Sequence, residues 1–109
     1  MRLIELIALF INQIAKELIM IKTDNGDFSP FYPAFPELSN KEIDTAMWLY
    51  MRFLPKNIAS LRGIRTDSVQ KQLGNIMEKL QVHSKVELEA VIARRVLIFA
   101  LCPGALVKI

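Results

Sequence analysis

Helix start and stop signals follow one another so closely over residues 38–88 that only short helices fit between them. Ser39, with Glu42 three residues later, has the spacing of a capping box, which marks a helix N-terminus. Pro55 suits the first turn of a second helix, and Gly63 suits the left-handed residue that ends it. This second helix and the one that follows its glycine turn form a helix-turn-helix pattern.

The third helix is predicted over residues 67–80, with Thr66 as its N-cap. Apolar residues recur along it at spacings of four, three and four, and they define its buried face: Val69, Leu73, Ile76 and Leu80. At about 100° per residue, five positions point most directly away from that face, and we term them the outward face: Asp67, Lys71, Gly74, Asn75 and Glu78.

A fourth helix is predicted over residues 85–101. Ser84 can cap it, and Glu87 three residues later completes a second capping box. Its apolar stripe is formed by Leu88, Val91, Ile92, Val96 and Phe99. Pro103 and Gly104 then stop the helix.

The first 37 residues have a different character. Residues 3–21 carry apolar side chains at spacings of three and four, which predicts an amphipathic helix with a wide apolar face. We expect this face to pack in the core or against a second copy rather than on a membrane surface. Three prolines predict a linker without regular structure over residues 23–37, pinned to the helices by its aromatic residues: Phe28, Phe31, Tyr32 and Phe35. The chain thus divides into an N-terminal helix (1–22), a linker (23–37) and a helical domain (38–109).

The composition restricts the class of protein. With 109 residues the chain has room for one small domain, and a hydrophobic content of 52% favours burial of some surface by another subunit. The single cysteine, Cys102, excludes an internal disulfide, and with the lone histidine, His83, it leaves no protein-only metal site. No segment reaches the roughly 18 apolar residues of a membrane span. We therefore expect a cytoplasmic protein without metal, cofactor or membrane role.

Positive charge is concentrated in the central segment. Residues 38–95 hold ten of the 14 Lys and Arg but only six of the 11 Asp and Glu. This surplus is compatible with a polyanionic partner, and it includes Lys56, Arg62, Arg65, Lys71 and Lys85.

Four motifs in this segment resemble, in order and spacing, the DNA-binding domain of the LuxR family of bacterial transcription factors, the four-helix type that also ends the NarL and FixJ response regulators. "LSNKE" is similar to the family's "LTPRE", "PKNIA" to "NKEIA", "GIRTDSV" to "GISEKTV", and "IMEKLQVHSKVEL" to "ILRKLGVRNRTEL". The resemblance covers about half of the chain and leaves the first 37 residues unexplained. It implies an all-α, four-helix domain whose third helix enters the major groove and whose fourth makes dimer contacts.

Two sets of functional positions follow from the resemblance. The positions that face the groove or the phosphates fall on Lys56, Arg65, Ser68, Gln70, Lys71, Gly74, Asn75 and Lys85. The dimer contacts of the fourth helix fall on Leu88, Val91, Ile92, Arg95 and Phe99.

The sequence also departs from the family pattern. Gln70 and Gly74 stand where the family usually has basic residues, and Gln72 stands where it usually has histidine. Arg52 replaces the first turn glycine, and Arg65 replaces the usual serine or threonine cap. The outward face consequently carries two acids against one lysine, whereas phosphates favour positive charge.

Two functions of different class follow. The first is a homodimeric transcriptional regulator that inserts its third helix into the major groove of double-stranded DNA. The second is an interaction module that keeps the scaffold without reading DNA and modulates another transcriptional regulator. Only the first requires the side chains of Gln70 and Lys71. We predict no catalytic residue and do not expect an enzyme, because His83 has no acid or cysteine partner fixed by the sequence.

Overall fold

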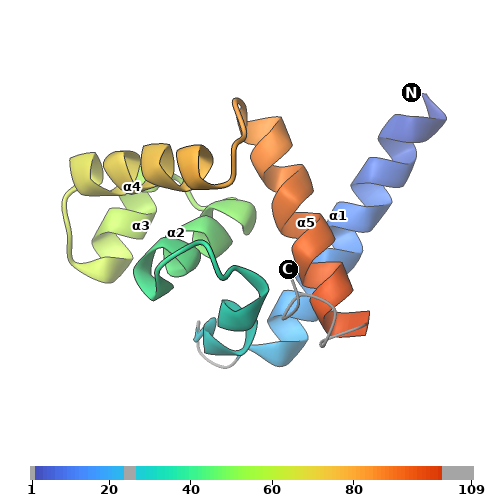
Figure 1. Cartoon of the computed structure of the whole chain (residues 1–109), viewed down its shortest axis with the longest axis horizontal. Coiled ribbons are helices and arrows are strands. Elements are labelled where there is room, and N and C mark those ends of the chain that lie inside the picture. The colour runs from blue at the N-terminus through green and yellow to red at the C-terminus, as the bar shows by residue number, and fades with distance from the viewer. Residues whose placement is uncertain (1, 24–26, 102–109) are drawn as a thin grey trace.

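The computed structural model describes residues 2–23 and 27–101, and its regular structure within these ranges is all helical. In chain order the elements are α1 (Leu3–Lys22), the 3-10 helix η1 (Ser29–Ala34), α2 (Asn40–Tyr50), α3 (Pro55–Arg62), α4 (Thr66–Lys79) and α5 (Lys85–Leu101). Figure 1 shows α2, α3 and α4 grouped at one end of the molecule, with α1 beside α5 at the other. None of these helices combines the length and the apolarity that a membrane crossing requires.

The segment between α1 and α2 contains η1, so the prediction that it lacks regular structure is wrong for residues 29–34. Proline fixes φ near the value of a 3-10 helix, and such a helix is short enough to tolerate the missing N–H groups of Pro30 and Pro33. The predicted anchoring by aromatic residues is confirmed by burial of Phe28, Phe31 and Phe35. The segment is therefore a packed part of the fold.

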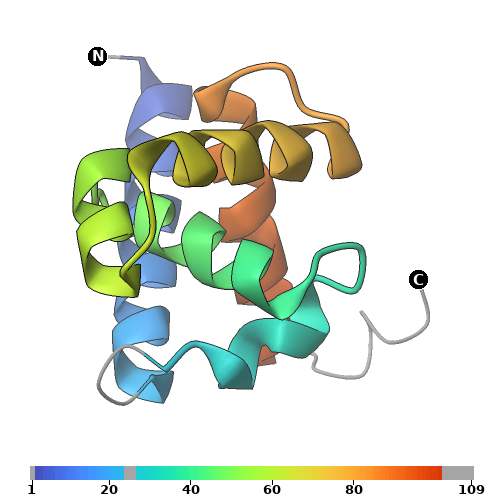
Figure 2. The same cartoon turned by 90° about the vertical axis from the view of Figure 1, so that its left-hand side faces the viewer.

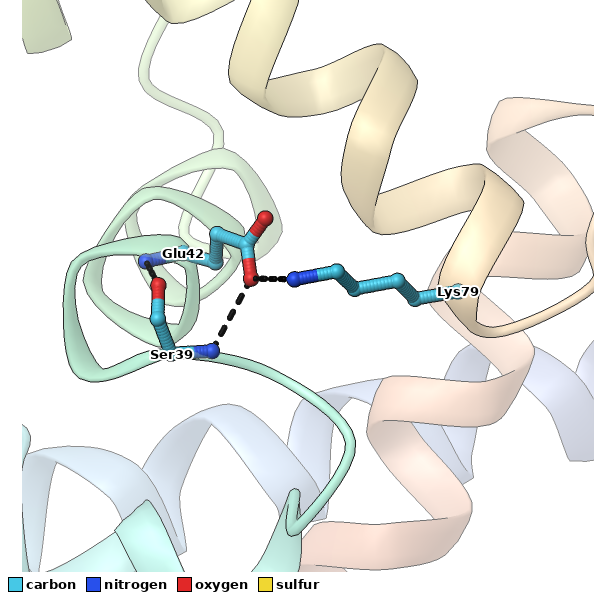
Figure 3. Close-up of polar contacts among 3 residues, drawn as sticks. All are labelled: Ser39, Glu42 and Lys79. Carbon is cyan, nitrogen blue, oxygen red and sulfur yellow. Dashed lines mark hydrogen bonds and ion pairs between the residues drawn. The ribbon is translucent and has the colours of Figure 1, made fainter.

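The predicted capping box at the start of α2 is confirmed, and it includes a partner from α4 (Figure 3). The Ser39 hydroxyl accepts a hydrogen bond from the Glu42 N–H at 3.2 Å, and Glu42 Oε1 accepts one from the Ser39 N–H at 2.9 Å. The same oxygen accepts a hydrogen bond from Lys79 Nζ at 2.8 Å. Burial raises the pKa of Glu42, but the bonds from Lys79 and Ser39 outweigh it and hold the pKa below its ordinary value. Glu42 thus ties the start of α2 to the end of α4.

The caps of α4 and α5 differ from the prediction in detail. Arg65, not Thr66, is the N-cap of α4, and its side chain makes no capping hydrogen bond. At the start of α5 the Ser84 hydroxyl accepts from the Glu87 N–H at 3.1 Å, as predicted. The Glu87 carboxylate, however, accepts from the N–H of His83 at 3.3 Å, one residue earlier than a capping box requires.

Three helix ends are followed by a residue in the left-handed backbone conformation. Gly63 ends α3 with a φ of 65°, as predicted. Arg52 after α2 and Gln81 after α4 have φ values of 73° and 57°, although neither is glycine. A residue with a side chain is strained there by roughly 1–2 kcal/mol, so these two turns have the shape that glycine adopts most readily.

Two apolar clusters hold the helices together. The larger one joins α1, η1, α2, α4 and α5, and α1 contributes Ala15 and Ile19 to it. The smaller one consists of Ile58, Ala59 and Val69, and it fastens α3 to α4. Because α1 shares the main core, the predicted N-terminal helix is not separate from the helical domain in this arrangement.

The face of α5 that was predicted to contact a second copy is covered by the chain itself. Leu88 and Ile92 are 3% and 1% exposed, and Val91 and Phe99 are half-buried against the same core. The elements that contact α5 are α1, η1 and α2. Four of the five predicted dimer contacts of α5 thus pack within the chain, against a core to which α1 and η1 contribute, and their contact with a second copy stays a prediction.

The fifth residue of that predicted interface, Arg95, also binds within the chain. Its guanidinium donates hydrogen bonds to both carboxylate oxygens of Glu37, at 2.7 and 2.5 Å, and to the Ala34 carbonyl at 3.1 Å. It also lies 5.9 Å from the ring centre of Phe35. Arg95 thus fixes the segment after η1 onto α5.

Candidate nucleic-acid interface

All eight residues predicted to face DNA are exposed. They lie on α3, at the N-cap and along α4, and at the start of α5: Lys56, Arg65, Ser68, Gln70, Lys71, Gly74, Asn75 and Lys85. The five residues of the outward face of α4 are exposed as well, as the periodicity predicts. Figure 2 shows α4 lying across one end of the molecule, so that a long side of this helix is open to solvent.

Packing on the inner side holds α4 in place. Val69 and Ile76 are fully buried, and Leu73 is half-buried against the main core. The turn between α3 and α4 is closed at Gly63. There the Ile64 N–H donates a hydrogen bond to the Ala59 carbonyl at 3.0 Å. The outward face is therefore presented by a helix that is fixed at both ends, through Gly63 at its start and Lys79 at its end.

A polar network that the sequence analysis missed joins α2, α3 and α4. The side-chain oxygen of Gln72 accepts hydrogen bonds from the Thr45 hydroxyl and from Arg62 Nη1, each at 2.7 Å. Arg62 also donates to Thr45 Oγ1, and Thr45 is fully buried. Gln72 turns inward here, and Arg62 belongs to this network, although it was counted with the basic surplus. The sequence contains one signal of this network: Gln72 lies four residues before Ile76, and therefore on the side of α4 that faces the core.

Gly74 leaves a gap in the middle of the outward face. A Cβ atom added to it would meet no heavy atom within 4 Å. Nothing in the fold therefore requires glycine at this position, and a larger side chain could extend from it into solvent. As the sequence stands, Gly74 offers only backbone to a ligand.

The charged residues at this surface differ in whether they form ion pairs within the chain. Arg65 lies 3.5 Å from Asp67, and both side chains are more than four-fifths exposed, so the pair is weak. Within the described ranges, no ion pair involves Lys56, Lys71 or Lys85. Three lysines from three helices are thus available to an anionic ligand.

The side chains of the outward face and its flanks suit hydrogen bonding to base edges. Gln70 and Asn75 can each donate and accept at adenine, and Lys71 can donate to guanine or to a phosphate. Asp67 and Glu78 repel phosphates unless they accept a hydrogen bond from cytosine. No group of His, Cys, Asp and Glu that could hold a metal ion occurs in the described part of the chain.

Comparison with models of protein families, with curated proteins and with solved structures gave no match.

Proposed function

We propose that this chain is a transcriptional regulator whose residues from 38 onward form a LuxR-type DNA-binding domain, with α4 as the helix that enters the major groove. The observation that carries the proposal is the outward face of α4. Its residues are exposed on a helix that a tight turn fixes to α3, and among the described residues the side chains of Lys71 and the neighbouring Gln70 form no hydrogen bond or ion pair within the chain. Polar side chains in this position are suited to a ligand.

The backbone supports the LuxR-type scaffold independently of side-chain similarity. The family has glycine after its first helix and in the "KLGV" motif after its third, and this sequence has Arg52 and Gln81 there. Both residues have a positive φ, which is the conformation that glycine adopts without strain. The two turns therefore have the shape that the family's glycines allow, although the residues differ.

In the proposed complex, α4 reads bases and the flanking lysines bind phosphates. Lys71 and Asn75 lie toward the middle of the outward face, with Gln70 beside them. Lys56 in the first turn of α3 and Lys85 at the start of α5 would contact the sugar-phosphate backbone on either side. Because few cations act and two acids oppose them, we expect modest affinity, with a dependence on salt that reflects about three phosphate contacts.

Fluorescence anisotropy of labelled duplex DNA tests the proposal. Pooled fragments of the source genome and a scrambled duplex would be titrated with wild type, Lys71→Ala and Gln70→Ala over a series of salt concentrations. Lys41→Ala is the matched control, because Lys41 is an exposed lysine on α2 outside the predicted interface. We expect the Lys71 variant to weaken binding about tenfold, the Gln70 variant to relax sequence preference, and the control to bind like wild type.

Absence of duplex binding at low salt, with a folded protein, would contradict the proposal. The chain would then fit the second function, an interaction module that pairs with another regulator. Unchanged binding by the Lys71 and Gln70 variants would also contradict it, since contact through any other surface leaves α4 without a role.

A further inference from the structure

Helix α1 exposes most of its apolar side chains. Among its described side chains only Ala15 and Ile19 are buried, whereas ten large apolar residues are 37–78% exposed. In Figure 1 the N-terminal half of α1 extends at the edge of the molecule, away from α3 and α4. The predicted wide apolar face therefore exists, but the described parts of the chain cover only one side of it.

This exposed surface is larger than a monomer usually leaves in water. Its ten large apolar side chains, at roughly 100 Å² each, expose on the order of 1,000 Å² in total, compared with roughly 300–600 Å² for the largest apolar patch on a typical monomer. It is close to the roughly 800 Å² that each partner contributes to a standard protein interface. The area thus fits one side of a stable dimer.

Five exposed apolar residues of α1 recur with regular spacing, and we call them the outer stripe: Leu3, Ile7, Phe10, Ile14 and Ile21. Its spacings of four, three, four and seven are those of a coiled-coil seam, in which knobs of one helix enter holes of another. A seam of this kind is complementary to a second identical seam, so two copies can pack about a two-fold axis.

The charges of α1 favour a second copy over a lipid surface. Glu17 lies in line with the outer stripe, between Ile14 and Ile21, so this seam carries one carboxylate and no cation. Lys16 is held 5.7 Å from the ring centre of Tyr50, on the side that faces the chain's own core. Among its described side chains, the helix therefore lacks the row of outward cations that binds helices of this kind to anionic membranes.

We propose that the outer stripe of α1 is the homodimer interface, and that two α1 helices pack antiparallel across it. A parallel pairing would place the two Glu17 carboxylates face to face, whereas an antiparallel pairing separates them. The dimer forms without nucleic acid, so this proposal stands or falls separately from DNA binding.

Sedimentation equilibrium of the full chain over a range of concentrations tests the interface. Wild type is expected to be a dimer, and Phe10→Glu is expected to raise the dimer dissociation constant at least a hundredfold. Leu9→Glu is the matched control, because Leu9 is also exposed on α1 but lies off the outer stripe, and this variant should dimerise like wild type. Circular dichroism should show equal helix content in all three proteins. A monomeric wild type, or equal loss of dimer in both variants, would overturn the proposal.

Disulfide cross-linking tests the antiparallel direction. In chains that carry Cys102→Ser, Ile14→Cys lies near the middle of the outer stripe, where antiparallel helices bring equal residues together, and it should cross-link to itself on mild oxidation. Ile21→Cys lies near one end of the helix and should not. Cross-linking at both positions would indicate parallel helices and overturn the proposed direction. Recovery of a monomeric wild type on vesicles of phosphatidylcholine and phosphatidylglycerol would replace the dimer by a membrane contact.

Discussion

The backbone favours glycine at Gly63 but not at Gly74, the two glycines of the helix-turn-helix. Gly63 has a φ of 65°, which a residue with a side chain adopts only under strain, whereas Gly74 lies inside α4 with open space around the position of a Cβ atom. Glycine in a helix interior is less favourable than alanine by roughly 0.5–1 kcal/mol. The same substitution should therefore have opposite signs at the two positions.

We predict that Gly74→Ala raises the free energy of unfolding by about 0.5–1 kcal/mol, because it removes the entropic cost of an interior helix glycine. Gly63→Ala should lower it by about 1–2 kcal/mol, because alanine is strained at a left-handed φ. Urea unfolding followed by circular dichroism measures both. A destabilising Gly74→Ala would mean that Gly74 makes a close contact, contrary to the space around it.

Single residues also show why the candidate site was only partly predictable. The exposure of Lys71, Asn75 and Glu78 follows from the helical period and the apolar positions of α4, which are local properties of the sequence. The pairing of Gln72 with Thr45 depends on where α2 crosses α4, and no local pattern contains that information. A contact between residues 27 positions apart becomes visible only in the folded chain.

At the scale of helices, one carboxylate links two elements and should respond to pH. The pKa of Glu42 is lowered in the fold from an ordinary value of 4.5, since the bonds from Lys79 and Ser39 outweigh burial. A lowered pKa in the folded state contributes stability above the unfolded pKa, and this contribution is lost as pH falls through the folded pKa. The stabilisation by the link between α2 and α4 should thus begin to decrease below about pH 4.5 and be lost once pH falls below the lowered pKa of the folded chain.

We predict that Glu42→Gln lowers the free energy of unfolding by about 1–2 kcal/mol at neutral pH, through loss of a charged partner for Lys79 and a weaker cap. The difference from wild type should shrink as pH falls below about 4.5, where Glu42 of the unfolded chain takes up a proton, and it should be lost below the lowered pKa of the folded state. Urea unfolding at a series of pH values measures it. Glu78→Gln, at an exposed position of α4, is the control and should change stability little at any pH. A difference that does not change with pH would argue against the ionised Glu42–Lys79 link.

Helix boundaries were predictable wherever the stop or start signal is local. The capping box of Ser39 and Glu42 and the left-handed Gly63 are confirmed within one residue of their predicted places. The start of α4 was misplaced by one residue, because a threonine has the stronger capping preference while the chain uses Arg65 without a side-chain cap. The sequence did not predict the 3-10 helix η1, because proline interrupts α-helices whereas a short 3-10 helix tolerates it.

At the scale of the whole molecule, the first 37 residues decide which surfaces remain exposed. Arg95 pairs with Glu37 across 58 positions of sequence, and α1 packs along α5, so the face of α5 is closed and the outer stripe of α1 is open. The family resemblance covers neither α1 nor η1. The resemblance therefore could not predict that α1 and η1 pack against the helix on which it places the dimer contacts.

We predict that the thermal midpoint of wild type rises with protein concentration, because unfolding of a dimer includes its dissociation. The midpoint of Phe10→Glu should be independent of concentration, since that variant is expected to unfold as a monomer. Differential scanning calorimetry over about a hundredfold range of concentration measures both. Equal concentration dependence in the two proteins would show that association does not occur through the outer stripe.

The open space at Gly74 also bears on how this surface can change over generations. Every glycine codon becomes an arginine codon by one base change at its first position, so a cation in the middle of the outward face lies a single mutational step away. The gap leaves room for the new side chain, and loss of the helix glycine favours folding. Under the proposed function, descendants of this chain can therefore acquire a cationic contact to DNA without first acquiring a stabilising mutation elsewhere.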